Sequence, residues 1–309
     1  MNSKPTGLVF GSVSGILNVD KPVGITSHDV VAQVRRLTGQ RKVGHAGTLD
    51  PMATGVLLLC LGQATRVAEY LLAGRKQYRA VVRLGASTDT YDADGAIIQS
   101  VESFGLSQDQ IAHAITSFQG VIQQVPPPYS AIRQKGRRLY ELARRGIAVE
   151  IPPRSVEIDR LELVAWESPH LTFDVTCSSG TYVRSLAHDL GQMLGVGGHL
   201  VELTRLASGS WQLQDAISLD DLQRAVEAGT WFHLLHPLDA ALRDFERVDL
   251  PADLAREVSQ GQPVLLDRTP ETSLVRGYAP DDRLVAVLQP SRKPGYWRPK
   301  KVFSKASDI

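Results

Sequence analysis

The loop at residues 44–55 constrains this chain more than any other feature, because it places one acidic side chain among turn-forming residues. Asp50 stands between glycines and a proline, and His45 precedes it by five positions. The apolar run 56–61 follows at once and has the length of a buried strand. Such a strand fixes where Asp50 points, and loops carried on rigid strands often hold catalytic groups. The alternative is a tight turn in which the aspartate bonds its own backbone.

The composition is that of an ordinary globular chain. Its 309 residues are 43% hydrophobic and 22% charged, with a formal net charge of +1. This length suffices for one large domain and a small one. Cys60 and Cys177 lie in apolar runs, so we expect buried thiols rather than a disulfide or a zinc site. No run approaches the ~20 apolar residues of a membrane helix and no signal peptide is visible, which predicts a soluble, cytoplasmic protein.

Positive charge is concentrated in two segments although the net charge is near zero. Residues 133–145 hold six Arg and Lys against one acid, and residues 292–305 hold six with no acid. A solvated surface is the plainer explanation of either cluster. Local asymmetry of this kind is also what a nearly neutral protein needs in order to bind nucleic-acid phosphates.

Several motifs beyond the loop follow one another in an order typical of a single family. Together with the loop they closely resemble the TruB family of tRNA pseudouridine synthases, which make the pseudouridine of the tRNA T-loop. The resemblance covers roughly residues 15–215, and its segments are LNVDKPVGITS (17–27), KQYRA (76–80), LGASTDTYDADG (84–95), QVPPPYSA (124–131) and CSSGTYVRSL (177–186).

Hydrophobic periodicity predicts strands interleaved irregularly with helices. Ser27 is expected to cap a helix that ends at Gly39, and Ser107 with Gln110 forms a capping box for another. A further helix is expected just after Tyr182. The other expected elements are strands at 16–19, 56–61, 78–84, 156–164, 170–177 and 199–207, and helices at 64–72 and from Ser218 onward.

The pattern indicates an α+β fold in several parts. Residues 1–14 are expected to form a flexible arm, 15–244 a catalytic domain, and 245–309 a small β-rich domain. Prolines bracket the basic segment 125–153, which we expect to project as an insertion. The resemblance implies a pseudouridine synthase fold, with a mixed, mostly antiparallel sheet flanked by helices, and a PUA-like RNA-binding C-terminal domain.

The resemblance implies that Asp50, Tyr78 and Arg184 are catalytic. A carboxylate can attack the ribose, or help to remove a ribose proton, and then leave; the sequence leaves both routes open. A buried Asp50 needs a nearby cation to stay ionised, and we expect the fork of Arg184 to hold it by paired hydrogen bonds. Tyr78 is expected to stack on the everted uracil and to take part in proton transfer at C5. No cofactor or metal is required.

Further positions are assigned to substrate binding by the same resemblance. Tyr182 is expected to shape the sugar side of the pocket and Leu203 the base side, while His45 occupies the gap left by the flipped base. Lys21 and Asp92 match motif positions and are expected to support the site. Outside these motifs, a strand tyrosine or leucine would be plain core.

The two basic segments are then expected to hold RNA. Arg133 and Lys135 belong to the insertion, which would clamp the T-arm stem-loop of tRNA through its phosphates. The tail at 292–305, with Tyr296, Trp297 and Phe303, would contact the acceptor stem.

Three functions fit these residues. The first is a stand-alone, monomeric synthase that converts uridine 55 of tRNA without an obligate protein partner. The second is a tRNA-binding folding chaperone with secondary or no catalysis. The third is a glycoside hydrolase in which Asp50 pairs with Asp89, Asp92 or Asp94, although the basic insertion argues against it.

Overall fold

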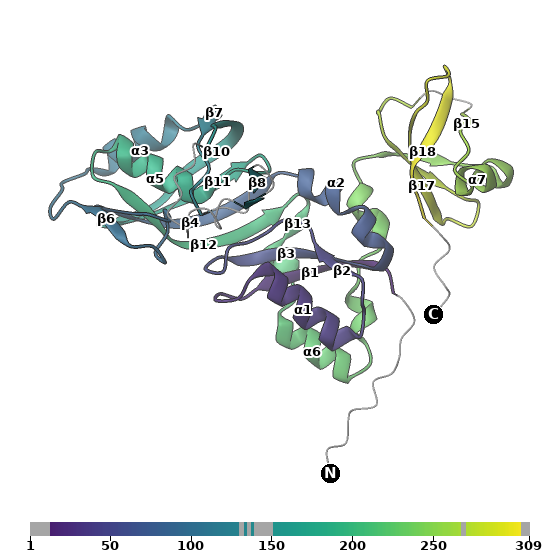
Figure 1. Ribbon diagram of the computed structural model, residues 1–309, viewed down its shortest axis with the longest axis horizontal. Helices are drawn as coiled ribbons and strands as arrows, with labels where there is room; N and C mark the ends of the chain where they lie inside the picture. The colour runs from purple at the N-terminus through teal and green to yellow at the C-terminus, as the bar shows by residue number, and fades with distance from the viewer. Residues whose placement is uncertain (1–12, 130–132, 135–136, 139–150, 267–269, 304–309) are drawn as a thin grey trace, which may run out of the picture.

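The computed structural model describes residues 13–129, 133–134, 137–138, 151–266 and 270–303. In this part of the chain, nine strands form a large sheet and five form a smaller one near the C-terminus (Figure 1). The large sheet has the order β1-β3-β12-β4-β11-β10-β7, with β2 beside β3 and β13 beside β12. Its strands are β1 (Gly15–Lys21), β2 (Val43–His45), β3 (Thr54–Leu61), β4 (Lys76–Leu84), β7 (Gly120–Gln124), β10 (Arg154–Glu167), β11 (His170–Cys177), β12 (Gly198–Ser208) and β13 (Trp211–Gln212).

Every pairing in the large sheet is antiparallel except that of β12 with β3. Helix α1 (Ser27–Thr38) contacts β2 and α6 (Leu219–Glu227) contacts β1, whereas α3 (Gln108–Thr116) contacts β10 and α5 (Val183–Met193) contacts β12 (Figure 1). The buried faces of these helices join the sheet in one core. The expected α+β class, a mixed and mostly antiparallel sheet flanked by helices, is confirmed.

Strand β3 is buried on both faces, which explains its unbroken apolar run. Leu57 and Leu59 face the core that includes α1, whereas Leu58 and Cys60 face a second cluster on the other side of the sheet. The second cluster also contains Leu71 of α2 (Ala68–Ala73). Because β3 is held on both sides, the loop that precedes it has a fixed foundation.

The start of α1 differs from the expectation by one residue. Thr26, not Ser27, is the N-cap, because Asp29 at the third helical position completes a capping box with Thr26. The Ser27 hydroxyl instead points inward, where it donates to the Leu49 carbonyl at 3.1 Å and accepts from the Leu49 N–H at 2.9 Å. Helix α1 is thereby bonded to the residue before Asp50.

Other boundaries follow the expectations in part. Gly39 ends α1 in a left-handed conformation with φ of 69°, and Ser107 and Gln110 form the expected capping box of α3. The helix expected at 64–72 is divided, because a 3-10 helix at Gly62–Arg66 precedes α2. A small sheet of β5 (Ala86–Thr88) and β6 (Ile97–Ser100) flanks the 89–95 turn.

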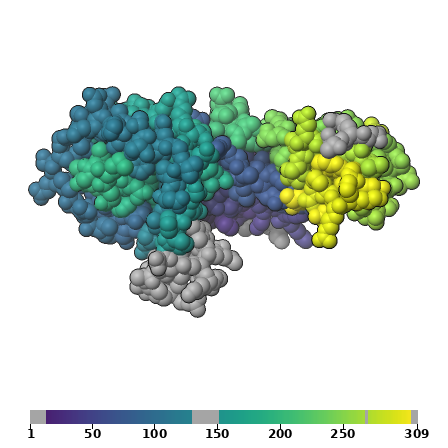
Figure 2. All heavy atoms as spheres, turned by 90° about the horizontal axis from the view of Figure 1, so that it is seen from above, coloured from purple at the N-terminus to yellow at the C-terminus, as the bar shows by residue number. Residues whose placement is uncertain are grey.

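The C-terminal sheet has the order β14-β16-β17-β18-β15. Lys301 pairs with Glu69 of α2 at 2.7 Å, and Phe303 is buried in the cluster that contains Leu71. These contacts join the C-terminal part of the chain to α2, and this part lies at one end of the long axis of the molecule (Figure 1 and Figure 2). The elements are β14 (Glu246–Asp249), α7 (Ala252–Ser259), β15 (Val264–Leu265), β16 (Val275–Tyr278), β17 (Leu284–Pro290) and β18 (Tyr296–Val302).

Some expectations fall outside the described residues. Residues 1–12 of the N-terminal arm, Lys135 and most of the basic insertion belong to this group. The insertion is represented by a two-stranded pairing of β8 (Arg133–Gln134) with β9 (Arg137–Arg138).

Candidate active site

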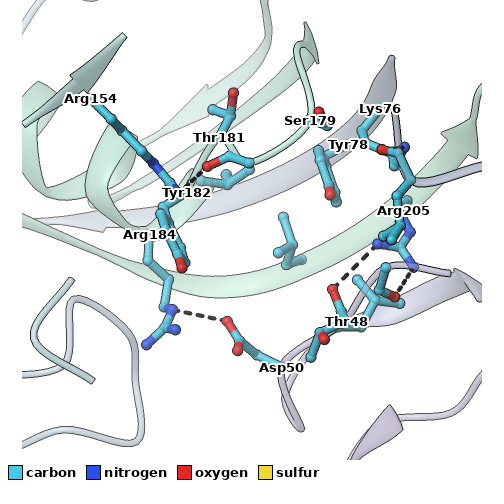
Figure 3. Close-up of a pocket in the computed structure, with 16 residues that line it drawn as sticks. Thr48, Asp50, Lys76, Tyr78, Arg154, Ser179, Thr181, Tyr182, Arg184 and Arg205 are labelled. Carbon is cyan, nitrogen blue, oxygen red and sulfur yellow. Dashed lines mark hydrogen bonds and ion pairs between the residues drawn. The ribbon is translucent and has the colours of Figure 1, made fainter. Parts of the chain in front are cut away.

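A pocket of about 280 Å³ opens where the Asp50 loop, β4, β12 and the start of α5 converge (Figure 3). Among the described residues, Asp50 is the acidic side chain in its wall, whereas four basic side chains line it. The pocket is lined by Gly47, Thr48, Leu49, Asp50, Leu72, Lys76, Tyr78, Arg154, Ser179, Gly180, Thr181, Tyr182, Val183, Arg184, Leu203 and Arg205. The excess of positive charge suits a polyanionic substrate.

The Asp50 loop is fastened by a buried lysine. Lys21 is fully buried, and its Nζ donates to the carbonyls of Pro22 and Ala53, each at 2.7 Å, and of Pro51 at 3.3 Å. The loop after Asp50 is therefore fixed from behind. Lys21 thus supports the site, but its burial precludes a direct contact with substrate in this conformation.

Asp50 itself faces the pocket with 36% of its side chain exposed, and Nε of Arg184 lies 2.9 Å from its Oδ2 (Figure 3). Burial raises the pKa of Asp50, the neighbouring Asp92 carboxylate raises it further, and Arg184 and Lys21 act in the opposite direction. Arg184 thus counteracts a desolvation that favours the neutral acid.

The raised pKa of Asp50 has a consequence for stability. Because the folded protein holds this proton more tightly than the unfolded chain, ionisation of Asp50 opposes folding above its usual pKa of 3.8. Asp50→Asn removes that cost and leaves Arg184 paired with Asp92. We therefore expect D50N to melt at a higher temperature than the wild type at pH 7–8, with the difference shrinking as pH falls toward 4. Calorimetry across this range checks the trend; a D50N protein that melts lower at neutral pH contradicts it.

Arg184 contacts several groups and not Asp50 alone. Its side chain is 7% exposed, and Nη1 reaches Asp92 Oδ2 at 3.1 Å and the Thr90 carbonyl at 3.3 Å, while Nη2 donates to the Tyr129 carbonyl at 3.1 Å. The Nε–H does not point along the line to Asp50, so that contact is an ion pair without an aligned hydrogen bond. The expected paired hydrogen bonds to Asp50 are not formed, because the rest of the fork is used elsewhere.

Asp92 therefore lies behind the pocket wall. Its side chain is 7% exposed and also accepts from the Thr90 hydroxyl and the Asp94 N–H. This arrangement fits a supporting role through Arg184 and not a substrate contact. It also weakens the glycoside hydrolase alternative, because Asp92 is occupied and Asp89 accepts from the Ala96 N–H.

Tyr78 and Tyr182 are the aromatic rings of the pocket. Tyr78 is 9% exposed, and burial raises the pKa of its hydroxyl. Tyr182 precedes α5, and the Gln124 side chain bonds both its N–H and its carbonyl, at 2.8 and 3.0 Å. The Arg154 guanidinium lies 4.4 Å from the centre of the Tyr182 ring. Leu203 also lines the pocket, as expected.

His45 is not among the described residues that line the pocket. Its ring lies 5.1 Å from that of His28, and its buried Nδ1 has no hydrogen-bond partner among the described residues. Burial lowers the pKa of His45, so the neutral form is favoured at pH 7. Arg133 lies in β8, on the basic insertion.

Comparison with known proteins places these residues in a family. Residues 35–183 match the model of the TruB family pseudouridylate synthase N-terminal domain, and 184–243 match that of the tRNA pseudouridylate synthase B C-terminal domain. The tRNA pseudouridine synthase B of Dehalococcoides mccartyi is 43% identical over 96% of this chain and 98% of its own length. The chain belongs to the TruB family. The tRNA pseudouridine synthase B of Yersinia pestis is 39% identical over 96% of this chain and 94% of its own length.

Solved structures agree with membership of the TruB family. A crystal structure of a Cbf5-Nop10-Gar1 complex contains a chain that is 28% identical, with a TM-score of 0.72 over 94% of this chain and 85% of that one. A chain of the archaeal box H/ACA sRNP Nop10-Cbf5 complex is 26% identical, with a TM-score of 0.70 over 94% and 86%. The pseudouridine synthase fold is thereby confirmed.

Three basic pocket residues of this TruB-family chain are not among the site residues expected from the sequence. Lys76 donates to the carbonyls of Leu71, Leu72 and Gly74, and burial lowers its pKa to about 8. Lys76 stands two positions before Tyr78 on an alternating strand, which was an available signal. Arg154 and Arg205 are brought in by tertiary pairing and had no such signal.

Two of the three aromatic residues of the basic tail do not have the exposed position that the sequence predicts. Trp297 and Phe303 are each 4% exposed and belong to the core, so neither can contact an acceptor stem in this conformation. Among the described residues, no His, Cys, Asp or Glu cluster could hold a metal ion. Within the same residues, no helix is long and apolar enough to cross a membrane.

Proposed function

We propose that this protein isomerises uridine 55 in the T-loop of tRNA to pseudouridine. The observation that carries the proposal is an aspartate paired with an arginine at the mouth of a basic pocket that also contains Tyr78. Its membership of the TruB family supports the reaction type, and the names of its relatives support tRNA as the substrate.

The pocket suits a nucleotide that has left its stack. Eversion costs a few kcal/mol, and stacking on an aromatic ring returns about 1–3 kcal/mol per base. Asp50 would act at the ribose, by attack on C1′ or by removal of a C2′ proton, and Tyr78 would lie against the base. Arg184 would keep Asp50 ionised before the step and stabilise it again when it leaves.

The protein would work alone. The root of its own insertion is bonded to the site, because the Val125 carbonyl accepts from Ser185 at 2.7 Å and the Tyr129 carbonyl accepts from Arg184. An RNA arm gripped by that insertion would thus be connected to the catalytic group without a second protein. The C-terminal sheet, a PUA-like module in this proposal, would add a second RNA surface.

Tritium release tests both the reaction and the position. With unmodified tRNA labelled at C5 of its uridines, we expect release of a single equivalent while the base stays attached to the chain. A matched transcript with cytidine at position 55 should release none. Persistent release from that transcript would contradict the choice of uridine 55, and free uracil would favour the hydrolase alternative. Binding of both transcripts without release would favour a chaperone.

A further inference from the structure

Arg205 lies at the junction of three strands beneath the pocket. On β12 it is directly opposite Tyr78 of β4 and Gly55 of β3 in the strand registers. Gly55 has φ of 97°, and a Cβ at this position would lie 2.3 Å from the Arg205 carbonyl oxygen. Only glycine therefore permits this approach. The backbone of Arg205 is fixed relative to both Tyr78 and the loop that carries Asp50.

The guanidinium of Arg205 is buried, and no acidic side chain among the described residues contacts it. The residue is 1% exposed, and its donors bond three carbonyl oxygens, those of Val56 at 2.6 Å, Thr48 at 3.4 Å and Gly47 at 3.2 Å. Arg184, by contrast, contacts two carboxylates. The two arginines stand on opposite sides of the pocket (Figure 3). A buried cation bonded only to dipoles keeps its charge available to nearby groups.

Tyr78 is a group that receives this charge. Burial raises the pKa of the Tyr78 hydroxyl, and the positive charge of Arg205, its neighbour in the strand register, acts in the opposite direction. Arg205 thus favours negative charge on the Tyr78 oxygen. The three carbonyl contacts do not explain why Arg205 lies opposite Tyr78, since a purely structural arginine needs no neighbouring hydroxyl.

We propose that Arg205 is a positioning residue for the isomerisation, which acts by holding a buried positive charge on the strand opposite Tyr78, where both residues line the pocket. The inference rests on the proposed function. After the base is rejoined through C5, the C5–H bond breaks and its electron pair forms the C5–C6 double bond. The C5 proton passes to the Tyr78 phenolate oxygen, and the π electron pair of the N1=C6 double bond moves to N1, which takes a proton from water. The hydroxide that remains then removes the proton from Tyr78. Arg205 supplies charge beside the oxygen that accepts the proton.

A double-mutant cycle separates this role from a structural one. We would measure single-turnover pseudouridine formation, with kcat and KM, in the wild type, R205M, Y78F and R205M/Y78F. In the Tyr78 background R205M should slow the reaction about 10- to 100-fold with KM nearly unchanged, a typical range for coupled neighbours. In the Y78F background the same substitution should have little effect. Additive losses would overturn the proposal, and so would a Y78F enzyme as fast as the wild type.

Controls keep the result interpretable. Arg79, the next residue on β4, is 50% exposed and paired with Asp174 at 2.8 Å, so R79M should leave the rate unchanged. If R205M fails to fold by circular dichroism, R205K is carried through the same cycle, because one lysine nitrogen cannot bond all three carbonyls and so cannot hold its charge where the guanidinium holds it. D50N is assayed in parallel. An active D50N would refute the proposed function, whereas an inactive D50N with an additive cycle would refute only the role of Arg205.

Discussion

Asp50→Asn is expected to abolish pseudouridine formation while tRNA binding stays at the wild-type level. Asparagine has nearly the same shape but cannot act as a nucleophile or a base, so a loss of about 10⁴-fold or more is expected, as for other essential nucleophiles. Binding should survive because Lys21 and Ser27 fasten the loop through hydrogen bonds to its backbone carbonyls, which do not use the Asp50 side chain. Tritium release measures the first quantity and filter binding the second.

The same pair of measurements separates the two principal functions. A synthase loses turnover and keeps affinity in D50N. A chaperone would keep its effect on tRNA folding in D50N as well, so that effect should be followed by thermal melting of the tRNA. Glu69→Gln provides a matched control, since its carboxylate pairs with Lys301 away from the pocket. Substantial pseudouridine formation by D50N would remove Asp50 from the mechanism.

Local sequence patterns could predict the parts of the site that lie on single elements. The Asp50 loop precedes an apolar strand and Arg184 lies on the first turn of a helix, so each position followed from its own segment. The motif resemblance then brought the two together. The resemblance did not predict how the nitrogens of Arg184 are shared among their partners, because Thr90, Asp92 and Tyr129 reach the guanidinium from separate turns.

Tertiary register explains most of the remainder. Arg205 meets Tyr78 only because β12 pairs with β4 in one particular alignment, and no short pattern encodes an alignment between distant strands. Thr26 and Ser27 both carry a hydroxyl that can cap a helix. The tertiary hydrogen bond of Ser27 to Leu49 leaves Thr26 as the N-cap. The sequence of the basic tail predicts that Trp297 contacts RNA, but this ring belongs to the core of the C-terminal sheet.

Arg184→Lys should be the most damaging substitution that conserves charge. The arginine serves Asp50, Asp92 and two carbonyls with three nitrogens, whereas lysine offers one nitrogen and must abandon most of them. Each charged hydrogen bond contributes about 1.5–3 kcal/mol, so a rate loss of about 10²–10³-fold is expected. KM should change little, because the side chain is 7% exposed and lies behind Asp50.

The pH profile of R184K tests the cause of that loss. Arg184 lowers the pKa of Asp50, so a weaker partner lets burial raise that pKa further. A smaller fraction of Asp50 is then ionised at any given pH, the acid limb of the rate profile moves to higher pH, and raising the pH restores part of the lost rate. Asp92→Asn, which removes a like charge but also loosens Arg184, should slow the reaction less, and its effect should not add to that of R184K. An acid limb that stays in place in R184K would mean that Arg184 serves the reaction through geometry alone and not through the charge of Asp50.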